Sequence, residues 1–156
     1  MICNLCPRRC GAERLPDRAG GVCAMPSLPV AARAMLHQWE EPCLVGEHGA
    51  GAVFFSGCNL RCKFCQNGII SQEGFGKTIS TERLREIFRE LVEQGAACLD
   101  LVTPTHFTDA VLEALGEERW PVPVVWNCGG YESVETLKRL EDRVQVYLPD
   151  LKYALT

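Results

Sequence analysis

The sequence predicts an α/β fold in which about four parallel strands alternate with helices, preceded by a small Cys-rich knuckle. Short apolar runs, typical of buried strands, occur at residues 52–56, 98–103, 122–127 and 144–149. Between them, apolar residues recur every three or four positions, as on one face of a helix, at residues 81–94, 108–116 and 132–141. Strands that alternate with helices form right-handed βαβ units and a parallel sheet.

The segment 81–94 gives the clearest helix prediction. Its apolar residues fall on one helical face: Leu84, Ile87, Phe88, Leu91 and Val92. Ser80 precedes the segment and is a suitable N-cap, because its hydroxyl can accept a bond from a free backbone N–H of the first turn. Gly95 follows the last turn and is expected to end the helix.

Residues 1–50 have a different character. The first 30 residues contain four cysteines and several prolines and glycines but no periodic segment. This predicts a loop-rich knuckle that needs stabilisation beyond its own packing, such as a bound metal. Residues 31–50 are expected to be a connecting stretch. We therefore predict a Cys-rich knuckle and connector over 1–50 and a core over 51–156.

The predicted core is short. An eight-stranded barrel takes roughly 250 residues, so the chain would form either a small open sheet or the front part of a larger barrel. A sheet that ends on an uncovered fourth strand would expose an edge, which proteins normally protect. We therefore expect the chain to be a C-terminally truncated fragment.

Composition narrows the class of protein. The chain has 156 residues, of which 47% are hydrophobic, and a net charge of -4, so nothing predicts binding to nucleic acid. No apolar run is long enough to span a membrane, and the chain opens Met-Ile-Cys-Asn without a secretion signal, which predicts the cytoplasm. Seven of the ten cysteines form two tight clusters. In a reducing compartment, clustered thiols are more often metal ligands than disulfides.

The second cluster follows the first predicted strand of the core. Cys58, Cys62 and Cys65 have the spacing C-x3-C-x2-C. Iron–sulfur clusters are held by closely spaced thiolates, and three thiolates leave one iron of a [4Fe–4S] cluster open to a substrate. The alternative is a zinc knuckle or three core cysteines, although structural zinc requires a fourth ligand.

This loop, with the aromatic Phe64 before its third cysteine, resembles the cluster loop of the radical S-adenosylmethionine enzymes. Four other segments are similar to an uncharacterised branch of that superfamily related to pyruvate formate-lyase activating enzyme: 3–10, 35–42, 101–107 and 147–153. Members of that branch are markedly longer. The resemblance implies a partial (β/α) radical-SAM barrel.

The resemblance also implies a mechanism. A reduced [4Fe–4S] cluster on Cys58, Cys62 and Cys65 would pass one electron to S-adenosyl-L-methionine. Cleavage would give methionine and a 5′-deoxyadenosyl radical that removes hydrogen from a substrate, which in an activating-enzyme-like protein is a protein. The electron would come from a low-potential donor such as a flavodoxin or ferredoxin. The alternative is a non-catalytic metal module that binds zinc or transfers electrons through an iron–sulfur centre.

Cofactor-binding residues are expected after the later strands. The family's Gly-Gly-Glu-type motif after the second strand is replaced here by residues 103–106, so Thr105 or backbone carbonyls would take over that contact. Asn127 and the following glycines at 129–130 are expected near the cofactor. The other residues to which the resemblance assigns cofactor contacts are Phe64, Asp150 and Lys152. Ordinary capping or turn chemistry is the alternative for such polar residues.

The first cysteine cluster has the spacing C-x2-C-x3-C-x12-C, formed by Cys3, Cys6, Cys10 and Cys23. Four thiols in a Gly/Pro-rich stretch predict a structural metal that supplies folding energy. The residue types leave zinc, a second iron–sulfur cluster and free thiols as possibilities. Cys98 lies within a predicted strand and is expected to be a small core residue.

Overall fold

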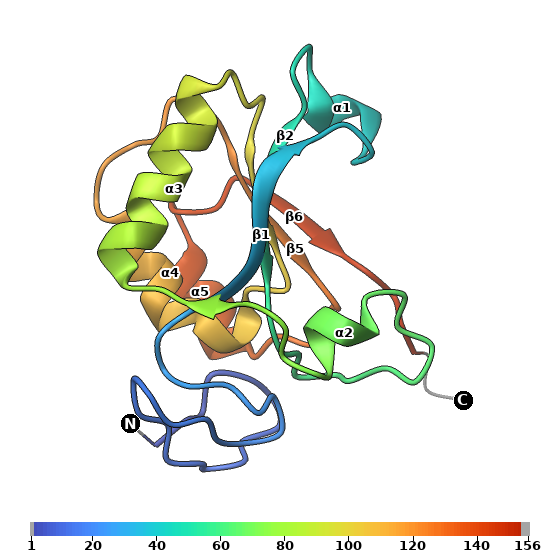
Figure 1. Cartoon of the computed structure of the whole chain (residues 1–156), viewed down its shortest axis with the longest axis vertical. Coiled ribbons are helices and arrows are strands. Elements are labelled where there is room, and N and C mark those ends of the chain that lie inside the picture. The colour runs from blue at the N-terminus through green and yellow to red at the C-terminus, as the bar shows by residue number, and fades with distance from the viewer. Residues whose placement is uncertain (1, 154–156) are drawn as a thin grey trace.

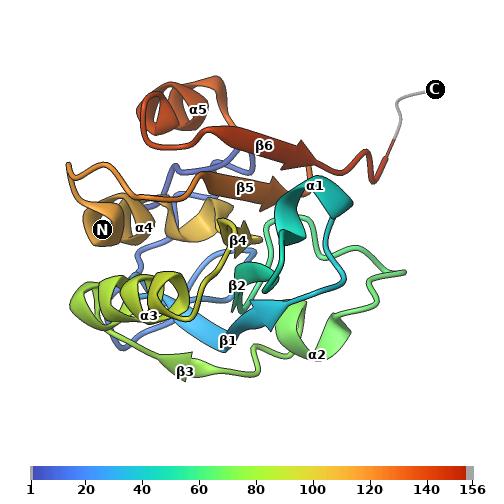
Figure 2. The same ribbon diagram turned by 90° about the horizontal axis from the view of Figure 1, so that it is seen from above.

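A computed structural model describes residues 2–153. Its centre is a twisted sheet with helices beside it (Figure 1). The sheet has six strands in the order β3-β1-β2-β4-β5-β6 (Figure 2). The strands are β1 (Val30–His37), β2 (Ala50–Phe55), β3 (Lys77–Thr78), β4 (Leu99–Val102), β5 (Val124–Cys128) and β6 (Val146–Pro149). The sheet therefore includes the four strands that the sequence predicts and two others.

The four predicted strands are parallel, as expected. Ala52 of β2 is paired with Asp100 of β4, and Asp100 is paired with Val125 of β5. β6 continues the same ladder beside β5, with Asn127 opposite Leu148. This register places the carboxyl ends of all four strands at one edge of the sheet, which is where parallel sheets build their sites.

Three helices cover one face of the sheet: α3 (Thr81–Glu93), α4 (Thr108–Leu115) and α5 (Val134–Leu140). Figure 2 shows them together on one side, with the short helix α1 (Pro42–Val45) on the other. Two other short elements lie in loops, α2 (Gly68–Ser71) and the 3-10 turn η1 (Thr105–Phe107). The N-cap prediction for α3 is confirmed, because the Ser80 hydroxyl accepts a bond of 3.1 Å from the Arg83 N–H. Gly95 follows that helix with φ of +91°.

The expectation that residues 31–50 only connect two regions is wrong. The segment contains α1 and most of β1, which runs antiparallel to β2 and pairs His37 with Ala50. β1 is only partly buried and shows no regular alternation of apolar and polar residues. β1 is a strand because it pairs with β2, and its residues have no alternating apolar pattern. The sequence of this segment alone therefore does not predict a strand.

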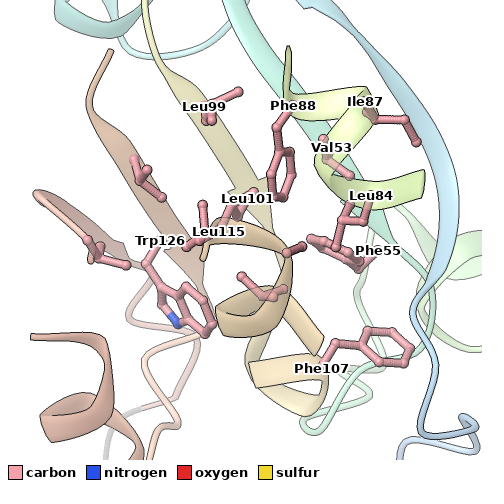
Figure 3. Close-up of a cluster of buried hydrophobic side chains, with 14 of the residues drawn as sticks. Val53, Phe55, Leu84, Ile87, Phe88, Leu99, Leu101, Phe107, Leu115 and Trp126 are labelled. Carbon is pink, nitrogen blue, oxygen red and sulfur yellow. The ribbon is translucent and has the colours of Figure 1, made fainter. Parts of the chain in front are cut away.

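The main core lies between the helices and the sheet (Figure 3). Trp126 of β5, Leu101 of β4 and Phe55 of β2 point to this face and are at most 1% exposed. They pack with Leu84 and Phe88 of α3, which are fully buried. The helical stripe predicted for residues 81–94 therefore faces the sheet, and burial of these side chains is the main source of stability.

The opposite face of the sheet has a smaller core. Its buried members are Leu44 of α1, Ala50, Cys98 and Val125. The prediction that Cys98 is a core residue is confirmed, since it is fully buried and its thiol donates to the Leu44 carbonyl at 3.4 Å. Burial raises the pKa of this thiol to about 12, so the thiol stays protonated.

A carboxylic acid lies on that same face. Asp100 occupies the middle of β4 and is fully buried, and neither of its oxygens has a hydrogen-bond partner in the described residues. Burial, followed by the neighbouring Glu40 carboxyl, raises its pKa to about 8, and the Asn127 amide opposes the shift. Asp100 is therefore protonated at neutral pH in the folded chain.

The knuckle has no helix or multi-residue strand among residues 2–29; its two short bridges pair Ile2 with Glu13 and Gly20 with Met25. A buried guanidinium attaches it to the core. Arg14 is 2% exposed and donates to the carbonyls of Met25 at 3.0 Å and His106 at 2.6 Å, and also to that of Pro26. The prediction of a loop-rich knuckle is thus confirmed.

No helix within residues 2–153 is both long enough and apolar enough to cross a membrane.

We expect Arg14→Lys to lower the free energy of unfolding by about 3 kcal/mol, because lysine lacks the planar fork of donors and leaves buried carbonyls unpaired. Urea denaturation would measure the change. Arg18→Lys is the matched control: Arg18 forms an exposed ion pair with Glu13, so its loss should stay within about 0.5 kcal/mol. Equal effects of the two substitutions would contradict a special role for Arg14.

The raised pKa of Asp100 predicts a pH-dependent stability. The folded state holds this proton up to about pH 8, whereas the unfolded chain releases it near the ordinary value of 3.8. Its stabilising effect is therefore complete below pH 4 and is lost as pH rises to 8, with a slope of at most about 1.4 kcal/mol per pH unit. Asp100→Asn should flatten this slope in denaturant titrations between pH 5 and 8; an unchanged slope would contradict the assignment.

Candidate cluster-binding site

The loop with the three central cysteines leaves the carboxyl end of β2 and ends at α2. Its first residue after Ser56 is Gly57, which has φ of +77°. A Cβ atom at this position would lie 2.3 Å from the Met25 side chain and 2.8 Å from the Cys23 carbonyl. Only glycine fits, because the loop passes directly against the knuckle.

The three cysteines are free thiols within this loop. Cys62 is 6% exposed, and Cys58 and Cys65 are half-buried. The Leu60 N–H donates to the Cys58 sulfur at 3.3 Å, and the Ser71 hydroxyl donates to the Cys65 sulfur at 3.2 Å. Such donors stabilise thiolates and tune the potential of a cluster that thiolates bind.

The donor chemistry of the loop fits an iron–sulfur cluster. Within residues 2–153, no three His, Cys, Asp or Glu side chains converge as the ligands of a single metal ion would. The geometry required for an iron–sulfur cluster is different. Each thiolate binds a separate iron, so the sulfurs need not converge on one point. Three thiolates on one short loop meet that requirement and leave a fourth iron open.

The end of β6 lies over this loop. Lys152 forms an ion pair of 2.5 Å with Asp150, and its hydrogen bond to this carboxylate is the main cause that raises the pKa of Lys152. The rings of Phe64 and Tyr153 lie 5.6 Å apart. The structure therefore brings three of the predicted cofactor-binding residues, Phe64, Asp150 and Lys152, to the cluster loop.

Asn127 lies at the end of β5, on the face of the sheet that α3, α4 and α5 leave free. Its side-chain amide is 3.5 Å from a carboxylate oxygen of Glu40. Of the two glycines after it, Gly129 lies against the cluster loop, since a Cβ atom at this position would lie 2.4 Å from the Leu60 side chain. Gly129 thus lets β5 pack against the loop.

Thr105 and His106 lie apart from these residues, after β4, and both are buried. The Thr105 hydroxyl donates to Glu132 at 2.5 Å, so a cofactor contact from this hydroxyl would require that bond to open. His106 Nε2 lies 2.7 Å from the Ser56 carbonyl, just before the cluster loop. Burial lowers the pKa of His106 to about 4, and a neutral ring that donates to this carbonyl supports the start of the loop.

The four N-terminal cysteines line one small cavity, together with Asn59 of the cluster loop and His106. Burial raises the pKa values of Cys6 and Cys23, whereas backbone N–H groups, first that of Ala12, lower the pKa of the exposed Cys10. Within residues 2–153 these thiols do not form a ready-made single-ion site, so a single metal ion would have to draw them together.

Sequence reasoning missed Glu40 and Asp100 as residues of interest. The available signal was a charged residue inside an apolar strand, Cys98-Leu99-Asp100-Leu101-Val102, because an acid is rarely placed in the middle of a buried strand without a role. The proximity of Glu40 to Asp100 could not be predicted from a local sequence pattern, because the two residues are far apart in the sequence.

The Radical SAM superfamily profile matches residues 52–151 of the chain. A protein of Methanocaldococcus jannaschii named "Uncharacterized protein MJ0674" is 33% identical over 159 residues. The alignment covers 97% of this chain but 45% of that protein, so the chain spans about half the length of its relative. No solved structure is significantly similar to the chain. The family profile covers most of the chain, including β2, β4, β5, β6 and the three-cysteine loop, and the chain belongs to the radical SAM superfamily.

Proposed function

We propose that the chain forms the cluster-binding part of an enzyme that cleaves S-adenosyl-L-methionine reductively and uses the resulting radical to remove hydrogen from a substrate. One observation carries the proposal. Three free cysteines with the spacing C-x3-C-x2-C lie on the loop that leaves the first parallel strand, in a chain of the radical SAM superfamily. The carboxyl end of a parallel strand is where such folds place their chemistry.

When bound, a [4Fe–4S] cluster supplies one electron to the sulfonium of S-adenosyl-L-methionine, whose bond to the 5′ carbon then breaks to give methionine and a 5′-deoxyadenosyl radical. Cys58, Cys62 and Cys65 would each hold one iron of this cluster and would leave the fourth iron free to bind the cofactor. A low-potential protein of the flavodoxin or ferredoxin type supplies the electron.

The surrounding residues set the environment of these thiolates. The Leu60 N–H and the Ser71 hydroxyl donate to two of the sulfurs. The Lys152 ammonium lies close enough to Cys62 and Cys65 for their charges to raise its pKa, and so it offsets negative charge at the loop. Phe64 of the loop packs against Tyr153, which follows β6, with the ring centroids 5.6 Å apart.

We assign cofactor contacts to Asn127 and Asp150, because Asn127 lies at the end of β5 and Asp150 follows β6, and both strands end at the same edge as the cluster loop. We retain an activating-enzyme-like role with a protein substrate as part of the proposal. It rests on the similarity of residues 101–107 and 147–153 to that branch of the superfamily.

We also propose that the N-terminal cysteines hold a second metal centre. Support comes from the cavity that all four of them line, and from Arg14, whose guanidinium lies 3.5 Å from the Cys3 sulfur and can donate to a thiolate. Soft thiolate ligands suit zinc and iron–sulfur centres alike. The centre would also stabilise a segment that has almost no secondary structure of its own.

Electron paramagnetic resonance tests the first centre. Anaerobically reconstituted, dithionite-reduced protein should give a [4Fe–4S]⁺ spectrum that changes when S-adenosyl-L-methionine binds the open iron. Cys58→Ala should abolish this change and lower the bound iron, and Cys43→Ala is the control, because Cys43 is a lone exposed cysteine outside both clusters. A cluster spectrum indifferent to S-adenosyl-L-methionine would favour an electron-transfer module instead.

Metal analysis tests the second centre. A variant with Cys58, Cys62 and Cys65 all replaced by alanine should retain one tightly bound centre, because the N-terminal cysteines are intact. Adding Cys6→Ser should release it, since this buried thiol belongs to the proposed ligand set. Mass spectrometry of the bound elements would identify zinc or iron, and a triple variant that binds neither would refute this second proposal.

A further inference from the structure

The face of the sheet opposite α3, α4 and α5 carries a group of three polar side chains, two of which, Glu40 and Asp100, have no role in the proposed cluster chemistry. Glu40 precedes α1, Asp100 lies in the middle of β4, and Asn127 lies at the end of β5. Asp100 is paired with Val125, two residues before Asn127 on the neighbouring strand, so Asp100 and Asn127 are diagonal neighbours on one face. Glu40 lies between β1 and α1, and its carboxylate is 3.5 Å from the Asn127 side-chain amide.

This group has many acceptors and few donors. Both oxygens of Asp100 are buried and lack a hydrogen-bond partner within residues 2–153. Neither Asp100 nor Glu40 is among the carboxylates that form salt bridges in the described part of the chain. The nearby donor is the single amide of Asn127. A buried carboxyl without a partner costs folding free energy, so the arrangement calls for a ligand that brings donors and positive charge.

The number and type of acceptors favour an ammonium group over a metal ion. A primary ammonium has three N–H donors, which matches the carboxyls of Glu40 and Asp100 and the amide oxygen of Asn127. Oxygen-binding metal ions prefer six or more ligands. In addition, the part of the chain that the structure describes contains no group of three His, Cys, Asp or Glu side chains suited to a metal ion.

We propose that Glu40, Asp100 and Asn127 form a binding site for the primary ammonium group of a small molecule or side chain. Asp100 is the buried floor of the site, and the half-buried Glu40 and Asn127 are its rim. On binding, the ammonium takes the place of the proton that the Asp100 carboxyl holds, and that proton is released to solvent. The site lies on the sheet face opposite the three covering helices, the face that lines the interior when such a sheet closes into a barrel.

The identity of the molecule that carries the ammonium group is inferred from the proposed function. A molecule held by its ammonium group at Asp100 would lie in the interior beside the edge that carries the cluster loop, which suits the substrate that donates hydrogen. S-adenosyl-L-methionine carries an ammonium group as well, so the test separates these two sources. Because binding is measured on protein without iron, failure of this site leaves the proposed cluster chemistry standing.

The probe is ethylammonium chloride, added at constant ionic strength to isotope-labelled, iron-free protein at pH 7. Nuclear magnetic resonance should show saturable shifts of the Asn127 side-chain amide and the Asp100 backbone amide. For so small a ligand, the expected Kd is on the order of 1 mM. Ethyltrimethylammonium has the same charge without N–H donors and should bind at least tenfold more weakly.

Two variants and one control locate the effect. Asp100→Asn keeps the shape of the side chain and removes its ability to ionise, so it should weaken ethylammonium binding at least tenfold. Glu40→Gln is a second, independent variant with the same expected loss. Glu41→Gln is the matched control, because Glu41 is the exposed neighbour in the sequence. Equal losses in all three variants would show general charge attraction and overturn the proposal.

Three further results would also overturn it. Equal binding of ethylammonium and ethyltrimethylammonium would exclude N–H recognition. Shifts of the same size with potassium or magnesium chloride, lost in Asp100→Asn, would make this an inorganic cation site. Displacement of ethylammonium by S-adenosyl-L-methionine would assign the site to the cofactor's own amino group instead of a substrate's.

Discussion

The site depends on the parallel register of β2, β4, β5 and β6. Because Ala52, Asp100 and Val125 are paired in one ladder, the four strands end together, and the segments that follow them meet at one edge of the sheet. The cysteine loop after β2, the glycines after β5 and Asp150 after β6 are neighbours for this reason alone. A slip of one strand would separate Gly129 from Leu60 and turn every side chain of that strand to the other face.

The same register gives the two faces of the sheet different chemistry. Leu99 and Leu101 point toward α3 and pack in the main core, whereas Cys98 and Asp100 point to the opposite face. The helix-covered face is wholly apolar at its centre and accounts for most of the buried surface. The opposite face keeps a buried acid, which a protein tolerates when a ligand or a function compensates for its cost.

Much of this fold could be predicted because its signals are local. Apolar runs predict four strands, the periodicity of residues 81–94, 108–116 and 132–141 predicts three helices, and cysteine spacing locates the loop that the superfamily profile contains. β1 was not predicted, because it is a strand through its pairing with β2 and not through its composition. The Glu40–Asn127 contact joins residues 87 positions apart, and Arg14 reaches His106 across 92 positions. Contacts between side chains so far apart in the sequence cannot be predicted from sequence periodicity.

The knuckle precedes the residues that anchor it in the sequence and is therefore synthesised before them. Arg14 donates to His106, and the Leu5 carbonyl accepts a bond from Thr136, which lies 131 residues further along. During synthesis on the ribosome, the knuckle therefore cannot dock until almost the whole sheet has emerged. Its four cysteines stay accessible throughout that interval, so a metal can reach them before the fold closes over them.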